Sequence, residues 1–208
     1  MKGGDLEKRH LELSKAMVEA DGSNIFPIDL YAFGCLKRSL ANCKGFYSLI
    51  SSRNLICAAG IIRMQLDTLL RFYAVFLVSD PHAFTSKVMG GERVKDFQDM
   101  AGKKLTDAHL KRTLSKMYPW MENVYNETSG YIHFSKKHIN SAINQISEDG
   151  SFDILISSED IERAEPYYDE ACGAFFNITS IFLDYIEGWV VTKNNPKLLA
   201  DVKEGLNT

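Results

Sequence analysis

Three charged side chains at helical spacing form the feature of this sequence best suited to chemistry. Arg63, Asp67 and Arg71 follow one another at intervals of four residues within a strongly apolar segment. Side chains four residues apart share one face of a helix, so the three predict a polar stripe on a buried helix. A buried charge without a partner is costly, so the stripe requires partners within itself or on a neighbouring helix. Two interpretations remain open: an anion or phosphate site held by two guanidinium groups, or an internal ion network that fixes helix register, which is a well-attested use of buried ions.

A second stripe places two hydroxyl groups and an imidazole on one helix face. Tyr125, Ser129 and His133 also recur at intervals of four residues. If this face meets the first stripe, the two would form a polar pocket between helices, which is a usual place for sites in helical bundles. The alternative is that His133 is an ordinary core or surface histidine. Lys136 and Lys137 follow directly and are expected to hold flanking phosphates if the ligand is a nucleic acid.

Signatures of metal and cofactor chemistry are missing from the sequence. His133 and His138 are five residues apart and therefore lie on different faces of a helix, and no cysteine or acidic residue stands near them at ligand spacing. The chain has no GxGxxG, P-loop, HExxH or GxSxG pattern. The sequence therefore predicts neither a metal site nor a cofactor.

The elements that must position these residues are predominantly helices. With 208 residues, 45% of them hydrophobic and 25% charged, the chain is expected to form one folded domain over residues 1–208. Apolar residues recur at three- and four-residue steps nearly throughout. The periodicity and the helix start and stop signals predict helices over Asp5–Ala20, Pro27–Ser52, Leu55–Val78, Thr106–Met117, Pro119–His133 and Ser157–Thr192. A short tail helix is expected after Asn194-Asn195-Pro196.

The predicted fold class is an all-α antiparallel four-helix-type bundle, with its core over residues 27–193, an extra N-terminal helix and a small β-hairpin insertion. Leu55–Val78 is apolar on every side, which places it at the centre of the bundle. Its length is similar to that of Pro166–Thr192, which favours antiparallel packing over a solenoid. The hairpin is predicted between Ile139–Ile146 and Phe152–Ile156, because Asp149-Gly150 is a turn signal.

Charge and cysteine content limit the function classes and the compartment. The formal net charge is −3, so the chain as a whole is no polycation. Lys103–His138 holds seven basic and three acidic residues, whereas Glu148–Glu187 holds eleven acidic residues and one basic. A basic half could meet a phosphate backbone, or oppositely charged helices could attract within one bundle or dimer. No apolar run is long enough to cross a membrane, no signal peptide is evident, and four cysteines without CxxC spacing are expected to be buried free thiols of a cytoplasmic protein.

The second stripe also carries a resemblance to a known family. The run from Tyr125 to Ser135, Tyr-Asn-Glu-Thr-Ser-Gly-Tyr-Ile-His-Phe-Ser, follows a helix with Arg63, Gln65, Asp67 and Arg71. In this it resembles the HEPN-like helical bundles of bacteria and archaea, many of which have a Tyr-x3-Ser-x3-His stretch. The resemblance spans Pro27 to Lys193 and implies a dimeric helical bundle that acts on RNA.

Active HEPN ribonucleases use an arginine separated from a histidine by four to six residues, in which the arginine steadies the cleaved phosphate and the histidine acts as acid or base. His133 matches that histidine. The positions that should hold the arginine are Asn126, Glu127 and Thr128, so the signature is absent. The resemblance therefore implies a ribonuclease site that is either degenerate or rebuilt from Arg63 and Arg71.

Two functions follow from these patterns. The first is a non-catalytic bundle that binds a partner protein or a second copy of itself to form a homodimer, which the missing arginine favours. The second is a metal-independent ribonuclease or RNA-binding defence protein. In that case His133 would perform acid–base work, Arg63 or Arg71 would bind phosphate, and Asp67, Tyr125 and Ser129 would complete the site.

Overall fold

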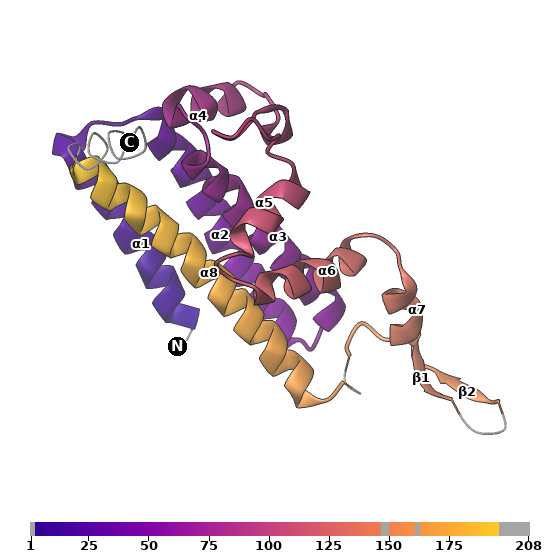
Figure 1. The fold of residues 1–208 in the computed structure, drawn as a ribbon. Coiled ribbons are helices and arrows are strands. Elements are labelled where there is room, and N and C mark those ends of the chain that lie inside the picture. The colour runs from indigo at the N-terminus through magenta and orange to yellow at the C-terminus, as the bar shows by residue number, and fades with distance from the viewer. Residues whose placement is uncertain (1–2, 147–149, 161–162, 196–208) are drawn as a thin grey trace.

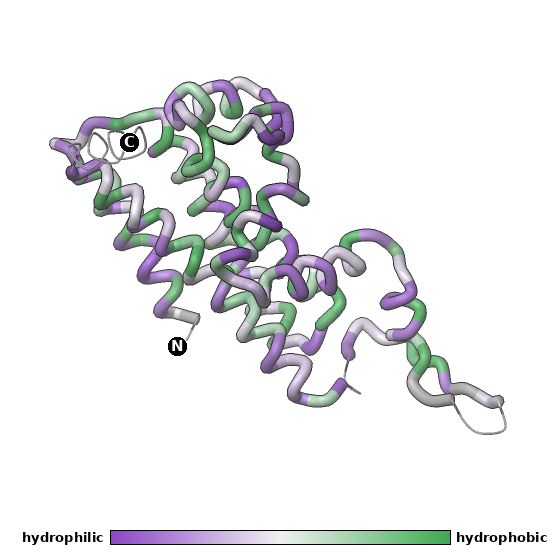
Figure 2. The backbone as a smooth tube through the Cα atoms, in the orientation of Figure 1, coloured by the Kyte–Doolittle hydropathy of each residue, from purple (hydrophilic) through white to green (hydrophobic). Residues whose placement is uncertain are grey.

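A computed structural model of the chain describes residues 3–146, 150–160 and 163–195, and confirms an all-α bundle (Figure 1). The elements are α1 (Gly3–Glu19), α2 (Pro27–Ser51), α3 (Leu55–Tyr73), α4 (Pro81–Met89), α5 (Asp107–Leu114), α6 (Trp120–Ile132), α7 (Lys136–Ala142), β1 (Ile143–Ile146), β2 (Phe152–Ile154) and α8 (Glu165–Asn194). Figure 2 shows apolar and polar residues alternating along the long helices, as expected for helices that bury one face.

The central position predicted for the most apolar segment is confirmed. Helix α3 packs against α2, α5, α6 and α8. Ten of its 19 residues are buried, compared with 11 of 30 in α8. The expected match in length between these two helices is wrong, because α3 ends at Tyr73 and continues only as a short 3-10 helix over Ala74–Phe76. Helix α3 as a whole is therefore surrounded by other helices on several sides.

Two carboxyl or amide side chains cap the start of α3. The Asn54 side chain accepts a hydrogen bond from the backbone N–H of Cys57 at 3.0 Å. Asp160 reaches the same end from a distant part of the chain and accepts from the N–H groups of Leu55, at 2.8 Å, and Ile56, at 3.3 Å. The predicted start of the last helix at Ser157 is therefore wrong: α8 begins at Glu165. A capping pattern in the sequence shows that a side chain can accept from free N–H groups, but it does not show which helix provides those groups.

The predicted hairpin is present and shorter than expected. Strand β1 pairs antiparallel with β2, with Ile146 opposite Phe152. The segment before β1 forms α7 instead of strand. Residues 147–149 of the predicted turn and the predicted tail helix beyond residue 195 lie outside the described residues. Figure 1 shows α7 and the hairpin projecting away from the bundle.

A chain of buried polar side chains connects three helices inside the core. The His10 ring accepts from Ser39 through Nε2, at 2.8 Å, while its Nδ1–H donates to the backbone oxygen of Leu6 at 2.7 Å. Ser39 accepts in turn from Gln65, which accepts from Asn42. Hydrogen bonding thus satisfies each polar group that α1, α2 and α3 bury here.

The cysteines are free thiols that differ in burial. Cys43 is buried as expected, but Cys57 is exposed, because it lies in the first turn of α3 near the surface. None of the helices in the described ranges is long and apolar enough to span a bilayer.

Candidate functional site

The two predicted stripes meet across a cleft between α3 and α6. The cleft has a volume of about 390 Å³ and takes residues from both stripes, together with neighbours on α2 and α5. Its lining consists of Arg38, Arg63, Met64, Asp67, Asp107, Tyr125, Ser129, Ile132 and His133. Five of the eight residues singled out in the sequence therefore line one concave surface.

Arg63 presents a cation with unused hydrogen-bond donors to this cleft. Its guanidinium lies over the Tyr125 ring, 4.1 Å from the ring centre, and its side chain is 13% exposed. The nearest carboxylate oxygen, on Asp107, is 3.6 Å away, too far for a hydrogen bond. Arg63 makes no hydrogen bond to any other described residue. The cation–π contact with the ring restrains the guanidinium, and the N–H groups are left available to an anion.

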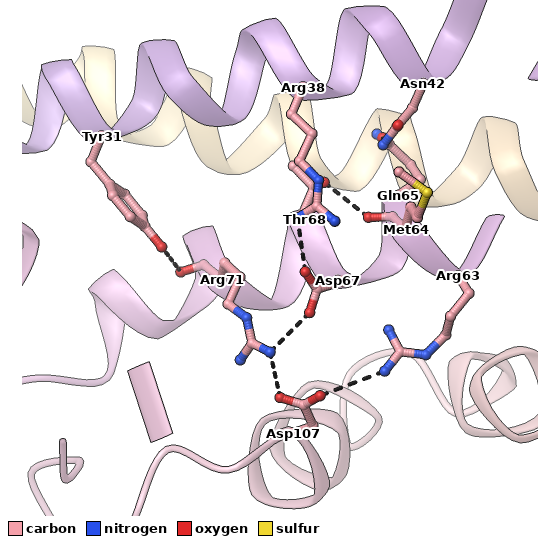
Figure 3. A network of polar contacts seen from close by, with 10 residues as sticks. All are labelled: Tyr31, Arg38, Asn42, Arg63, Met64, Gln65, Asp67, Thr68, Arg71 and Asp107. Carbon is pink, nitrogen blue, oxygen red and sulfur yellow. Dashed lines mark hydrogen bonds and ion pairs between the residues drawn. The ribbon is translucent and has the colours of Figure 1, made fainter. Parts of the chain in front are cut away.

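An ion network holds the other side of the cleft (Figure 3). The Asp67 carboxylate accepts from Arg38 at 2.8 Å and contacts Arg71 at 2.9 Å. Asp107 contacts Arg71 at 2.6 Å and, more distantly, Arg63. Three guanidinium groups thus share two carboxylates. The cluster carries one surplus positive charge beside a cleft, which favours anions there.

Arg71 lies behind the cleft, where it bridges two carboxylates, and does not line the cleft. Its guanidinium bridges Asp67 on its own helix and Asp107 on α5. Burial acts to lower the pKa of Arg71, but the two carboxylates outweigh burial and the pKa is raised. Arg71 is therefore firmly charged and committed to protein partners. Of the two arginines predicted from the stripe, Arg63 alone borders the cleft.

His133 lies at the mouth of the cleft, at the end of α6. Its backbone is extended, with φ −111° and ψ 144°, so the helical spacing predicted for the second stripe stops at Ile132. The imidazole is exposed and forms no hydrogen bond or ion pair with the described residues. The Ser129 hydroxyl donates to the Tyr125 carbonyl at 2.6 Å, so toward a ligand it can act only as an acceptor.

A tight connection between α6 and α7 fixes the place of His133. The Ser135 hydroxyl donates to the carbonyl of Gly130 at 2.8 Å. A Cβ atom on Gly130 would lie 3.1 Å from Cδ of Lys137, so the glycine lets α7 fold back closely. Lys137 is paired with Glu127 and lies near the Tyr131 ring. Neither Lys137 nor Lys136 lines the cleft, although both were expected to flank the site.

The sequence reasoning missed two residues of the site, Arg38 and Asp107. Arg38 stands on α2 between Lys37 and Ser39, and a charge in such a polar run usually means a solvated face. Asp107 follows the N-cap Thr106 in the first turn of α5, where an acidic residue is expected on helix-dipole grounds alone. Each lies on a helix far along the chain from the stripe, so no spacing rule connects them to it.

The described residues contain no group of three or more His, Cys, Asp or Glu side chains that could hold a metal ion. The cleft itself presents guanidinium groups, an imidazole, hydroxyl groups and the carboxylates of Asp67 and Asp107. Comparison of the chain with protein-family models, with curated proteins and with solved structures gave no match.

Proposed function

We propose that the cleft between α3 and α6 binds the phosphodiester backbone of single-stranded RNA. The observation that carries the proposal is Arg63, which is held on Tyr125 with free donors in a cleft of surplus positive charge. A guanidinium with fixed orientation suits a phosphate, because its parallel N–H groups match two phosphate oxygens.

The charge distribution supports a nucleic acid over a small anion. The cleft takes Asp107, Tyr125, Ser129 and His133 from the segment Lys103–His138, which has a net charge of +4. A strand leaving the cleft along this segment meets more basic than acidic side chains. An open cleft also suits a single strand, whose backbone can bend into it and whose bases are splayed out.

His133 makes metal-independent cleavage the activity to test at this cleft. In such a reaction the imidazole accepts the proton of a ribose 2′-hydroxyl, and the 2′-oxygen forms a bond to phosphorus. The bond from phosphorus to the 5′-oxygen breaks, and that oxygen takes up a proton as it leaves. Arg63 would stabilise the negative charge that develops on the phosphate. The products would be a 2′,3′-cyclic phosphate and a free 5′-hydroxyl.

Fluorescence anisotropy with a labelled single-stranded RNA tests the binding. Arg63→Ala should weaken binding at least tenfold, because one charge-assisted pair to phosphate contributes on the order of 1.5–3 kcal/mol. Arg93→Ala is the matched control: its side chain is 68% exposed, pairs with Asp96 and lies away from the cleft. Equal loss in both variants would show that RNA binds by overall charge and not in this cleft.

The cleavage assay uses the same RNA with EDTA present. If His133 is the base, His133→Ala should abolish cleavage while leaving the affinity for RNA and the melting temperature nearly unchanged, because the exposed imidazole packs against little. Residual cleavage at the rate of the unaltered protein would remove His133 from the reaction. Absence of cleavage by the unaltered protein would leave the cleft as a binding site.

A second function, self-association, is favoured by one specific observation. Large exposed apolar side chains occur just after α6, on the projecting α7, and in or next to β2: Phe134 (82% exposed), Ile139 (51%), Ile154 (63%) and Ile156 (85%). Exposed apolar surface of this kind marks an interaction site. We propose that a second copy of the chain covers it.

The test of self-association is the molar mass in solution, measured by light scattering after size exclusion. The unaltered protein should have the mass of a dimer, and the double variant Phe134→Ser, Ile156→Ser that of a monomer. Val191→Ser is the control, because Val191 is 50% exposed on α8, away from the hairpin. A monomeric unaltered protein would contradict the proposal.

A further inference from the structure

A second cavity adjoins the cleft on the other side of the ion network. It has a volume of about 280 Å³ and lies between α2, α3 and the end of α4. Arg38 lines both the cleft and this second cavity, and Arg71 lines the second. Figure 3 shows Tyr31, another lining residue, and Arg63 on opposite sides of the pair formed by Arg38 and Asp67. A ligand held at Arg38 could therefore reach into both spaces.

One of the residues that line the cavity is a helix residue without a side chain. Gly34 lines it from the middle of α2. Glycine in a helix interior is less favourable than alanine, so a physical reason for it is expected. Neither close contact nor backbone conformation supplies one: a Cβ atom there would meet no atom within 4 Å, and the φ angle is not in the left-handed region. The cavity therefore has free space at this position for a larger side chain.

Arg38 and Arg71 lie at one side of the cavity, and most of the other residues that line it are apolar or neutral. Tyr31 and Met89 contribute an aromatic ring and a thioether. Burial raises the pKa of the Cys35 thiol to about 12 and also raises the pKa of Tyr31, so both groups stay neutral at physiological pH. The Tyr31 hydroxyl donates to the Arg71 carbonyl at 3.3 Å, so toward a ligand it can act only as an acceptor. Such walls suit the faces of a flat ring system.

The size and the charge of the surroundings limit the ligand further. At about 280 Å³ the cavity is smaller than the range of roughly 300–1,000 Å³ that is typical of drug-sized ligands, so a single ring system is the appropriate size. Arg38 at its edge can stack on an aromatic ring while its charge faces a phosphate. An aromatic ring joined to a phosphate fits this combination.

We propose that this cavity receives the base of a nucleotide whose phosphate is held in the neighbouring cleft beside Arg38 and Arg63. The proposal rests on the proposed RNA binding and adds that the protein contacts a base of the strand as well as its phosphate. Because the lining has few free hydrogen-bonding groups, the base is held by stacking, and discrimination between bases is weak.

Isothermal titration with three small ligands tests the proposal: ribose 5-phosphate, which has no base, and the 5′-monophosphates of uridine and adenosine. In the unaltered protein both nucleotides should bind about 5- to 150-fold more tightly than ribose 5-phosphate, the range expected for stacking one base. The two nucleotides should differ from each other by much less than that.

Gly34→Leu fills the cavity with a side chain that favours a helix, and Gly34→Ala is the matched control that fills little of it. Gly34→Leu should reduce the affinity for both nucleotides to that of ribose 5-phosphate and leave the affinity for ribose 5-phosphate unchanged. Gly34→Ala should retain most of the advantage of the nucleotides. Melting curves of both variants establish that they are folded.

The outcomes separate this inference from the proposed function. If ribose 5-phosphate and the nucleotides bind equally well to the unaltered protein, the cleft takes phosphate but the cavity takes no base, and the inference is overturned. The same holds if folded Gly34→Leu keeps the advantage of the nucleotides. If none of the three binds to the unaltered protein, the phosphate site itself fails, and both proposals fail with it.

Discussion

At the scale of single residues, we expect Asp67 to act on stability and on the proposed ligand binding in opposite directions. Its carboxylate neutralises part of the charge of Arg38 and Arg71, which holds the network together but reduces the attraction of the cleft for anions. Its side chain is 20% exposed, so it is shielded from water only in part. If the ion network had a structural role only, replacing Asp67 would change the stability of the protein and leave its affinity for RNA unchanged.

We predict that Asp67→Asn lowers the free energy of unfolding by about 1–3 kcal/mol, because Arg38 and Arg71 lose a charged partner. The same variant should bind RNA more tightly, because the surplus positive charge beside the cleft rises by one. Urea denaturation measures the first effect and fluorescence anisotropy the second. A variant that is destabilised without any gain in RNA affinity would indicate that the network has a structural role only.

The sequence was sufficient to predict which residues share a face, but not all of their partners. Arg63 and Asp67 were found from one helix, and Tyr125 and His133 from another, because helical spacing is a local property. Arg38 and Asp107 come from two further helices. Which faces meet depends on packing across long separations in sequence, and that information is not contained in any local pattern.

At the scale of elements, α1 is attached to the bundle through a buried histidine. Burial lowers the pKa of His10, although its bond to the Leu6 carbonyl acts in the opposite direction. In the unfolded chain the imidazole titrates near 6.5. Between the two pKa values the unfolded state binds more protons than the folded state, so the contribution of His10 makes stability fall as the pH falls below about 6.5.

We therefore predict that the protein loses unfolding free energy between about pH 7.5 and pH 5.5, and that His10→Gln is less stable at pH 7.5 but shows a smaller loss over the same range. The difference between the two slopes isolates His10 from the other titrating groups. Urea titrations at several pH values provide the measurement. Parallel slopes would contradict the assignment of the pH dependence to His10.

The start of α3 provides a second test at this scale. Asp160 binds two of its free N–H groups from a segment more than one hundred residues away, so it both caps the helix and fixes the return of the chain. Asp160→Ala should lower the free energy of unfolding by about 0.5–2 kcal/mol, the usual range for an N-cap. Glu159→Ala removes the neighbouring carboxylate and should have little effect. Equal effects of the two substitutions would show that local charge, and not capping, is responsible.

The start of a helix was predicted correctly where the signal lies within one turn of it. The prediction was wrong where the capping residue binds a distant helix. The Asn54 cap and the start of α2 at Pro27 follow from residues within one turn. Ser157 and Asp160 have the spacing of a local capping box, yet Asp160 caps α3. A side chain that can bind free N–H groups does so wherever tertiary structure brings them.

At the scale of the whole molecule, a fully buried ion pair joins α8 to α2, two helices far apart in the sequence. Lys193 on α8 donates to Asp29 at 2.9 Å and to the carbonyl of Met17 at 2.8 Å, and both charged side chains are completely buried. The Trp189 ring nitrogen also donates to Asp29, at 2.7 Å. The pair thus ties α8 to α1 and α2. The sequence analysis missed it, because a lysine and an aspartate 164 residues apart show no pattern.

Lys193→Ala should lower the free energy of unfolding by about 3–5 kcal/mol, because it leaves a buried carboxylate without its cation. Lys15→Ala is the control: Lys15 is 76% exposed and pairs loosely with Glu19 at 3.7 Å, so its loss should change stability very little. Thermal or urea denaturation compares the two. Similar stability of both variants would show that Lys193 is not enclosed as described.

The salt dependence of RNA affinity tests the central claim most directly, because its slope counts the phosphates that the protein neutralises. For single strands, log affinity falls with log salt by about 0.7 per phosphate contact. If Arg63 holds a phosphate in the cleft, Arg63→Ala should make the slope shallower by about 0.7, while Arg93→Ala leaves it unchanged. A slope that Arg63→Ala does not alter, or that both variants alter equally, would contradict a phosphate site in this cleft.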